Sequence, residues 1–197
     1  MIRFDAEAFR SINNLAGKNA ALDAAGVFCA RYLIILMFVA VLVRAYLAAR
    51  RPESRSLAAA LTVAEFRALV AAGLAFLGNW LFSLLAFRPR PYVSLKDVHL
   101  IVPPPLTPHA FPSGHSSVAF ALAFTLLFVD PPFGLAMLVA AAAVALGRVY
   151  VGVHYPLDVV VGIFVGLFWA LVMHGLGTRV HDLDFVRRFV VRKLTRR

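Results

Sequence analysis

The chain has 197 residues, of which 61% are hydrophobic and only 15% are charged, and its mean hydropathy is +0.81. Because soluble domains are only about half apolar, this composition excludes a soluble globular protein and predicts an integral membrane protein. The net charge of +10 does not indicate nucleic-acid binding, because the basic residues flank apolar segments. The single cysteine, Cys29, lies in an apolar run, which excludes a disulfide framework.

The N-terminal segment, residues 1–20, predicts an amphipathic helix and not a cleavable signal. Phe4, Ala8, Ile12 and Leu15 recur at helical spacing, and charged residues between them interrupt any apolar core. We expect this helix to lie in the membrane interface. A frayed polar terminus is the alternative.

Five apolar segments follow, and each approaches the length that crosses about 30 Å of hydrocarbon. They are residues 26–47, 69–87, 113–129, 133–150 and 156–177. The sequence therefore predicts an all-α fold: one domain over residues 1–197, a polytopic bundle of about five transmembrane helices, with its core at 26–178. We expect the basic tail, residues 179–197, to lie on an anionic leaflet, with an ordinary solvated tail as the alternative.

The distribution of lysine and arginine predicts the orientation. The tail and the turn at residues 50–56 are rich in these residues, which places both in the cytoplasm. Five spans then put the N-terminus, the loop at residues 88–111 and the turn at residues 148–155 together on the other side. We therefore expect a multi-pass membrane protein with these loops on the face opposite the cytoplasm.

Two histidines stand where polar turns meet apolar segments. One helical turn after His154 comes Asp158, whose carboxylate can fix the imidazole tautomer and stabilise its cation. The other ring nitrogen is then free to attack phosphorus. His115 lies in the first turn of a helix, where it can protonate a leaving oxygen. The alternative for His154 is a helix-packing or interfacial residue, and the alternative for His115 is an interfacial histidine.

The neighbouring residues are suited to binding an anion. Ser113 and Gly114 open a helix whose unpaired amides an anion can approach closely, although Ser113 alone also reads as a helix cap. Arg90 and Arg148 carry planar cations that match phosphate oxygens, with membrane-edge anchoring as the alternative. Arg88 is either a further residue of this anion site or an ordinary surface residue, and the sequence leaves both open. These arginines would repel a divalent cation, so we expect no metal and no cofactor.

The same residues resemble the signature motifs of the type-2 phosphatidate phosphatase superfamily, whose relatives include the vanadium haloperoxidases. The family pattern is K-x6-R-P, then P-S-G-H, then S-R-x5-H-x3-D. The second motif is complete at residues 112–115. The third has Arg148, His154 and Asp158 at the family spacing, but Gly147 stands in place of the serine. This resemblance implies a helical membrane core.

The first motif is partial. Arg90 and Pro91 match it, but Ser83 occupies the position of the lysine, and Arg88 is a candidate to compensate. The resemblance implies a role for each matching position. His154 would be the nucleophile that forms a phosphohistidine, Asp158 would orient it, and His115 would be the general acid. The phosphate would be held without a metal by Arg90, Arg148, Ser113 and the Gly114 amide.

Within the family, the stretch RVYVGVHYPLDV and the absence of the lysine are similar to the bacterial undecaprenyl-diphosphate phosphatases of the bacitracin-resistance type. The expected reaction converts undecaprenyl diphosphate to undecaprenyl phosphate and phosphate, which recycles the lipid carrier for cell-wall synthesis. A phosphatase for phosphatidylglycerol phosphate or lipid A is the alternative, and a lipid-phosphate transporter without catalysis is a more distant one. In each case the partner is a lipid phosphate in the membrane. The resemblance implies a protein of the bacterial inner membrane, with its site on the periplasmic or extracellular face and its C-terminus in the cytoplasm.

Overall fold

The computed structural model describes residues 3–50, 55–85 and 87–194, with side chains placed for 3–48, 50, 63–85 and 87–176. This part of the chain is all-helical, as the sequence predicts, and it contains no strand beyond one isolated bridge between Pro89 and His109. The helices are α1 (Arg3–Asn13), α2 (Ala20–Arg31), α3 (Leu33–Ala49), α4 (Arg55–Leu85), α5 (Pro91–Ser94), α6 (Gly114–Leu127), α7 (Pro131–Tyr150) and α8 (Pro156–Leu194).

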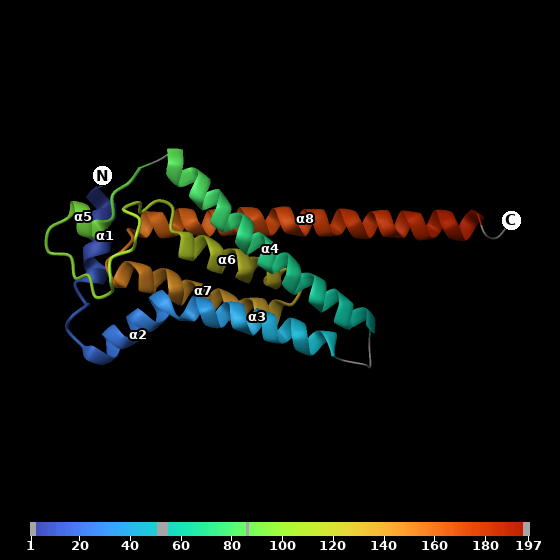
Figure 1. The fold of residues 1–197 in the computed structure, drawn as a ribbon, viewed down its shortest axis with the longest axis horizontal. Coiled ribbons are helices and arrows are strands. Elements are labelled where there is room, and N and C mark those ends of the chain that lie inside the picture. The colour runs from blue at the N-terminus through green and yellow to red at the C-terminus, as the bar shows by residue number, and fades with distance from the viewer. Residues whose placement is uncertain (1–2, 51–54, 86, 195–197) are drawn as a thin grey trace.

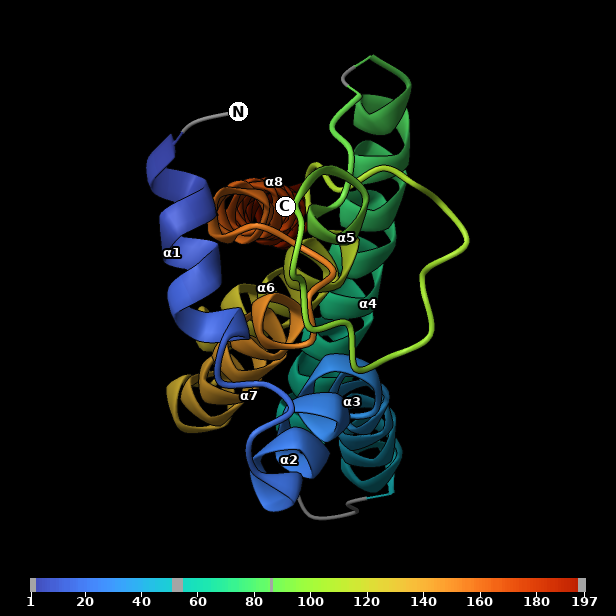
Figure 2. The same cartoon turned by 90° about the vertical axis from the view of Figure 1, so that its left-hand side faces the viewer.

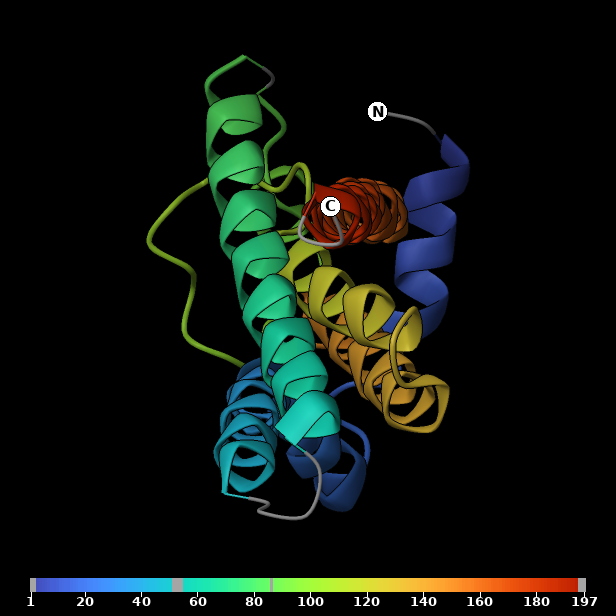
Figure 3. The same ribbon diagram turned by 90° about the vertical axis from the view of Figure 1, so that its right-hand side faces the viewer.

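The long helices run roughly along one axis, and α8 extends well beyond the others toward the C-terminus (Figure 1). The opposite end carries α1, the short α5 and the loop around it (Figures 1 and 2). Seen from the C-terminal end, α6 lies between α4 and α7, with α8 beside it (Figure 3). The chain is therefore built around α6, and its loops gather at one end of the bundle.

Glycines on α8 let that helix approach α6 closely. A Cβ atom at Gly162 would lie 2.9 Å from the carbonyl oxygen of Ser113, and one at Gly166 would lie 2.7 Å from the amide nitrogen of Ala121. Small residues spaced four apart are the usual means by which membrane helices pack backbone against backbone. This packing fixes where α8 begins relative to the start of α6.

The first predicted span, residues 26–47, is not one straight helix. It divides at Tyr32 into α2 and α3, whose axes differ by 51°. The two halves have different neighbours, because α2 packs on α7 while α3 packs on α4. The break also leaves carbonyl groups at the end of α2 without partners in the helix. One of them, on Ala30, binds an arginine described below.

Within the described part of the chain, three helices are long and apolar enough to cross a membrane, at Val63–Leu85, Pro131–Tyr150 and Pro156–Leu176. The bent pair α2–α3 makes a fourth if it counts as one span. With only 14 residues, α6 is about 21 Å long and is buried by its neighbours over most of its length. The structure thus supports a multi-pass membrane protein but does not confirm the predicted count of five spans.

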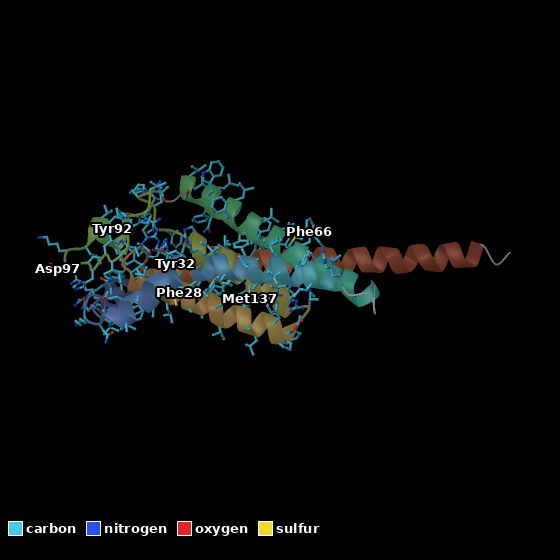
Figure 4. All side chains as sticks on the ribbon, turned by 60° about the horizontal axis from the view of Figure 1, so that its bottom comes forward. Phe28, Tyr32, Phe66, Tyr92, Asp97 and Met137 are labelled. Atoms are coloured by element: carbon cyan, nitrogen blue, oxygen red, sulfur yellow. The ribbon has the colours of Figure 1, made fainter. Side chains whose placement is uncertain are left out.

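The outside of the bundle is also apolar. Phe28 and Tyr32 lie exposed near the break between α2 and α3, and Phe66 projects from α4 (Figure 4). Large hydrophobic side chains are likewise exposed along α3, α4 and α8. A helix that is apolar on all sides suits a bundle whose surroundings are lipid.

The predicted N-terminal helix is present as α1, and it buries a partly polar face. Its buried residues are Asp5, Phe9 and Asn13, whereas Phe4 and Leu15 are exposed. Its placement in the membrane interface stays a prediction. The side chains of the basic tail and residues 51–54 of the basic turn lie outside the described residues, so their predicted positions stay predictions too.

Replacing Gly166 with alanine should destabilise the bundle, because the new methyl group would meet the α6 backbone at 2.7 Å. We expect a loss of about 1–3 kcal/mol, measured as a lower midpoint of thermal unfolding in detergent. Gly73→Ala is the matched control, since a Cβ there meets no atom within 4 Å. Equal midpoints for the two variants would contradict the proposed packing.

Candidate active site

The elements that carry the predicted site residues meet at the loop-bearing end of the bundle (Figure 2). There α6 and α8 begin, α7 ends, and the loop from Phe87 to Ser113 crosses over them. The backbone amide of Ser113 donates to the carbonyl of Asp158 at 3.0 Å, which ties the start of α6 to the start of α8. The N-terminal helix lies at the same end, as the charge pattern predicts.

His154 is held in a tight turn between α7 and α8. Gly152, with φ of +89°, provides the left-handed residue that this turn requires. The imidazole is almost fully buried, with Nδ1 lying 2.8 Å from the carbonyl oxygen of Ala110 and Nε2 lying 3.1 Å from Nη1 of Arg90. Because a guanidinium can only donate, Nε2 must be the acceptor. Nδ1 therefore carries the ring proton and donates its hydrogen bond to the carbonyl oxygen of Ala110. The ring is therefore the tautomer with a lone pair on Nε2.

The surroundings of His154 favour its neutral form. Burial lowers the pKa of the imidazole well below the ordinary value of 6.5, and the positive charges of Arg148 and Arg90 lower the pKa further. The hydrogen bond to Ala110 acts in the opposite direction but is the smaller effect. His154 is thus a neutral base at neutral pH, with its lone pair facing Arg90 and with the charge of Arg148 nearby. Such a nitrogen can act as a nucleophile toward an anion that those cations hold.

Asp158 lies beside His154 without a hydrogen bond to it. Its Oδ2 atom is 3.7 Å from Nδ1 of His154 and accepts the backbone amide of Tyr155 at 2.8 Å. This carboxylate therefore caps the start of α8 and contributes a nearby negative charge. The group bonded directly to Nδ1 is the carbonyl of Ala110, which sequence reasoning missed because a backbone carbonyl leaves no sequence signal.

Backbone groups hold the two predicted phosphate arginines. Arg90 donates from Nε to the carbonyl of Thr107 at 2.9 Å and from Nη1 to the carbonyl of Val153 at 3.0 Å. Arg148 donates from Nη1 to the carbonyl of Ala30 at 3.1 Å. The Nε atom of Arg148 is buried and has no partner within the described part of the chain. That N–H group is available to an anion's oxygen.

The start of α6 has the features of an anion-binding helix terminus. Ser113 occupies the cap position, but its side chain makes no capping bond and accepts a hydrogen bond from Ser116 Oγ at 3.0 Å. The first-turn amides of α6, beginning with Gly114, therefore have no side-chain cap. An anion bound here would accept hydrogen bonds from these amides and would lie at the positive end of the helix dipole.

His115 and Gly114 are among the residues that line an apolar groove of about 500 Å³. The rest of the groove is lined by α3, α4 and α6 side chains, among them Ile34, Phe38, Leu69, Phe76 and Val118. The charges of Arg148 and Arg90 act on His115 as well as on His154. An apolar groove whose lining includes the positive end of a helix matches a molecule with a hydrocarbon chain and an anionic head.

Arg88 differs from the other predicted phosphate ligands. Its guanidinium already pairs with two carboxylates, those of Asp5 and Asp158, and lies 4.1 Å from the ring centre of Tyr155. Ser83, at the position of the family's lysine, donates to the carbonyl of Trp80 at 2.7 Å. Both side chains thus have hydrogen-bond partners already, whereas Arg148 has an Nε atom that is unpaired among the described residues. Sequence reasoning also missed Asp5, whose spacing of four and eight residues from Phe9 and Asn13 was the available signal.

The departure from the family's third motif has a packing reason. A Cβ atom at Gly147 would lie 2.8 Å from the amide nitrogen of Ala30 and 3.1 Å from the Cβ of Cys29. Glycine thus lets the end of α2 come close enough for its carbonyl to bind Arg148. Cys29 lies against α7 at the same place.

The family model of the PAP2 superfamily matches residues 64–181, which cover most of α4 and all of α5, α6 and α7. The chain belongs to this superfamily. The match confirms the resemblance found from the motifs, and it supports a lipid phosphatase.

Known proteins match this chain over most of its length. Undecaprenyl-diphosphatase BcrC of Bacillus subtilis is 30% identical, over 97% of this chain and 95% of its own length. The bacitracin transport permease protein BcrC of Bacillus licheniformis is 29% identical, over 84% of this chain and 76% of its own. The crystal structure of Aquifex aeolicus LpxE shares the fold, with a TM-score of 0.66 and 24% identity over 88% of this chain and 96% of that one.

The low pKa of His154 predicts the acid limb of the pH profile. If its Nε2 atom is the nucleophile, kcat/KM should not fall as the pH passes through the ordinary histidine value of 6.5, because His154 stays unprotonated there. The limb should lie well below that value. Titration of the substrate by its ³¹P chemical shift separates substrate ionisation from that of the enzyme. A limb at or above pH 6.5 that belongs to the enzyme would contradict the assignment.

Proposed function

We propose that this protein is a membrane lipid pyrophosphate phosphatase that converts undecaprenyl diphosphate to undecaprenyl phosphate and phosphate. The observation that supports this most is the lone pair on Nε2 of His154, which lies 3.1 Å from Arg90 in a site that also contains Arg148. A buried neutral imidazole among arginines is suited to attack a phosphorus atom whose negative oxygens the arginines neutralise.

In the first step, Nε2 of His154 attacks the terminal phosphorus, and the bond from that phosphorus to the bridging oxygen breaks. The products are a phosphohistidine and the lipid monophosphate. Throughout, the proton on Nδ1 stays in its hydrogen bond to Ala110, and the Asp158 carboxylate, 3.7 Å away, stabilises the positive charge that develops on the ring.

The transferred phosphoryl group would be held by hydrogen-bond donors that are unpaired in the free enzyme or can exchange their partner for a phosphate oxygen. Arg90 now donates to Nε2, and substrate binding would transfer that N–H group to a phosphate oxygen. The unpaired Nε of Arg148 and the uncapped Gly114 amide provide two more donors. Donors fixed in advance at the place where charge develops are the usual source of large rate enhancements.

His115 is the proposed general acid and base. It gives a proton to the leaving oxygen in the first step, then takes one from the water that attacks the phosphohistidine. Phosphate leaves, and Nε2 recovers its lone pair. The negative charge of the bound phosphate favours the protonated form of His115 that the first step needs.

We propose that this chemistry uses no metal ion. The arginines supply the positive charge that a divalent cation provides in other phosphatases. In addition, the described residues contain no group of three or more His, Cys, Asp or Glu side chains arranged to hold a metal.

The choice of a diphosphate rests on the relative from Bacillus subtilis, which is named for that substrate and matches the chain almost from end to end. The positive charge of the site gives weaker support for a diphosphate substrate, because Arg88 already forms ion pairs with Asp5 and Asp158. The apolar groove beside His115 is suited to a hydrocarbon chain of any lipid. Phosphatidylglycerol phosphate and lipid A therefore remain the alternative substrates.

We also propose that the site faces the periplasmic or extracellular side of a bacterial inner membrane, with the C-terminus in the cytoplasm. The support is the concentration of lysine and arginine in the tail and in the turn at residues 50–56. The site lies at the opposite end of the bundle from the C-terminus (Figure 1).

A transporter that binds a lipid phosphate without hydrolysis is the second candidate, and the name of the Bacillus licheniformis relative favours it. Binding needs the arginines and the helix terminus, but it needs neither a nucleophile nor an acid. The histidine pair therefore favours the phosphatase.

Purified protein should release phosphate from undecaprenyl diphosphate in the presence of EDTA, with a higher kcat/KM than for phosphatidylglycerol phosphate or lipid A 1-diphosphate at equal detergent mole fraction. His154→Ala should reduce this rate by roughly 10⁴-fold or more, as expected for loss of a nucleophile. His174→Ala, at an exposed histidine on α8, is the matched control and should retain the rate.

Each arm has its own contrary result. Release by His154→Ala at the full rate would remove the proposed mechanism. A higher kcat/KM for a glycerophosphate would contradict the proposed substrate but not the proposed mechanism. Dependence on added Mg²⁺ would contradict the proposal that the reaction uses no metal ion. A folded wild-type protein that releases phosphate from none of these lipids would favour the transporter.

A further inference from the structure

Asp5 on α1 is a buried carboxylate that the proposed chemistry does not use. It is only 4% exposed, although it lies near the N-terminal end of a helix whose other charged side chains are exposed. One of its oxygens accepts the backbone amide of Leu157 at 2.9 Å, and the other pairs with Arg88. A buried carboxylate is costly unless such partners compensate it, so its position calls for a reason.

The two contacts of Asp5 lead directly to the turn that carries His154. Leu157 is the second residue of α8, and its amide is one of those that a helix start leaves without a partner. Arg88 continues from Asp5 to Asp158, and its position is fixed further by the ring of Tyr155 at 4.1 Å. Asp5 therefore supports the start of α8 both by a direct bond and through Arg88.

The other end of α1 holds the opposite side of the same turn. Asn13 donates to the carbonyl of Tyr150, the last residue of α7, at 2.8 Å. It also donates to the carbonyl of His99 at 2.9 Å and accepts the amide of His99 at 2.9 Å. Because the turn from Tyr150 to Leu157 is held at both ends by one face of α1, this helix bridges the segment that positions His154.

Asp5 also changes the charge beside His154. Arg88 shares its single positive charge between Asp5 and Asp158, so the three groups together carry a net charge of −1. Without the charge of Asp5, Arg88 would neutralise Asp158 fully. The negative potential that stabilises a positive imidazole would then be weaker.

We infer that Asp5 is a positioning residue of the phosphatase site, which acts on His154 through Arg88, Asp158 and the amide of Leu157. This inference rests on the proposed function and deepens it, because it makes the N-terminal helix part of the active site. Asp5 does not line the apolar groove. Its loss should therefore affect the chemical step more than substrate binding.

Other charged groups also act on His154, and all of them must be kept constant in the test. They come from the segment before α5, from α6, from α7 and from α8, and they are Arg90, His115, Arg148 and Asp158. Arg88 and Asp5 lie behind Asp158. A substitution at Asp5 leaves the nearer groups in place.

Asp5→Asn should lower kcat by roughly tenfold or more, as expected for a small misplacement of a reacting group, while KM changes little. The acid limb of kcat/KM should move to lower pH, because a neutral side chain at position 5 makes protonation of His154 less favourable. Asp5→Glu keeps the charge and should leave that limb where it lies in the wild type. Glu7→Gln is the matched control, since Glu7 is exposed on the same helix and pairs only with Arg3 among the described residues; it should leave kcat and the limb unchanged.

Arg88→Gln provides a test of opposite sign. It removes a positive charge from the same chain of groups, so the acid limb should move to higher pH. If Asp5→Asn does not give a folded protein, as judged by size exclusion in detergent, the shift in Arg88→Gln and the unmoved limb in Asp5→Glu decide the question.

The inference is overturned if folded Asp5→Asn keeps the wild-type kcat and acid limb, or if the limbs of Asp5→Asn and Arg88→Gln move in the same direction. These outcomes are distinct from failure of the proposed function, which would appear as an inactive wild type or an active His154→Ala variant.

Discussion

The structure of the site depends on placing one histidine in a buried position where it stays neutral. Nδ1 of His154 donates to Ala110, and Nε2 faces Arg90, which can only donate. This pair of contacts determines the tautomer and leaves one lone pair among fixed cations. Burial then keeps that lone pair unprotonated. A phosphate dianion would supply the negative charge that such a site lacks.

Much of the scaffold can be understood as the means of holding these few groups. The glycines of α8 bring its start against the start of α6, and Gly147 admits the end of α2, whose free carbonyl orients Arg148. The loop over the site returns through the bridge between Pro89 and His109, which brings Ala110 to the imidazole. Close backbone packing is what a bundle of apolar helices can offer in lipid, where hydrophobic burial gives little preference between partners.

The sequence predicted the helical membrane class and the meeting of the motif residues at one end, because composition, charge and residue spacing carry that information directly. It did not predict the division of the first span, because the reason lies in two different packing partners of one apolar segment. Arg88 was open between site and surface in the sequence, and only the fold reveals that its guanidinium pairs with Asp5 and Asp158. The partner of His154 was missed since a backbone carbonyl belongs to every residue.

The central claim is that His154 attacks through Nε2 while Nδ1 remains bonded to Ala110. The most direct measurement identifies the isomer of the phosphohistidine, by rapid alkaline quenching during turnover of undecaprenyl diphosphate, followed by ³¹P NMR and mass spectrometry of the digested protein. In His115→Ala, hydrolysis of the intermediate should be slowed more than its formation, because a phosphate leaving group needs less proton donation than an alkoxide, so more phosphohistidine would be trapped. The account predicts phosphate on Nε2 of His154. Phosphate on Nδ1, phosphate on another residue, or turnover with no phosphoenzyme would contradict it.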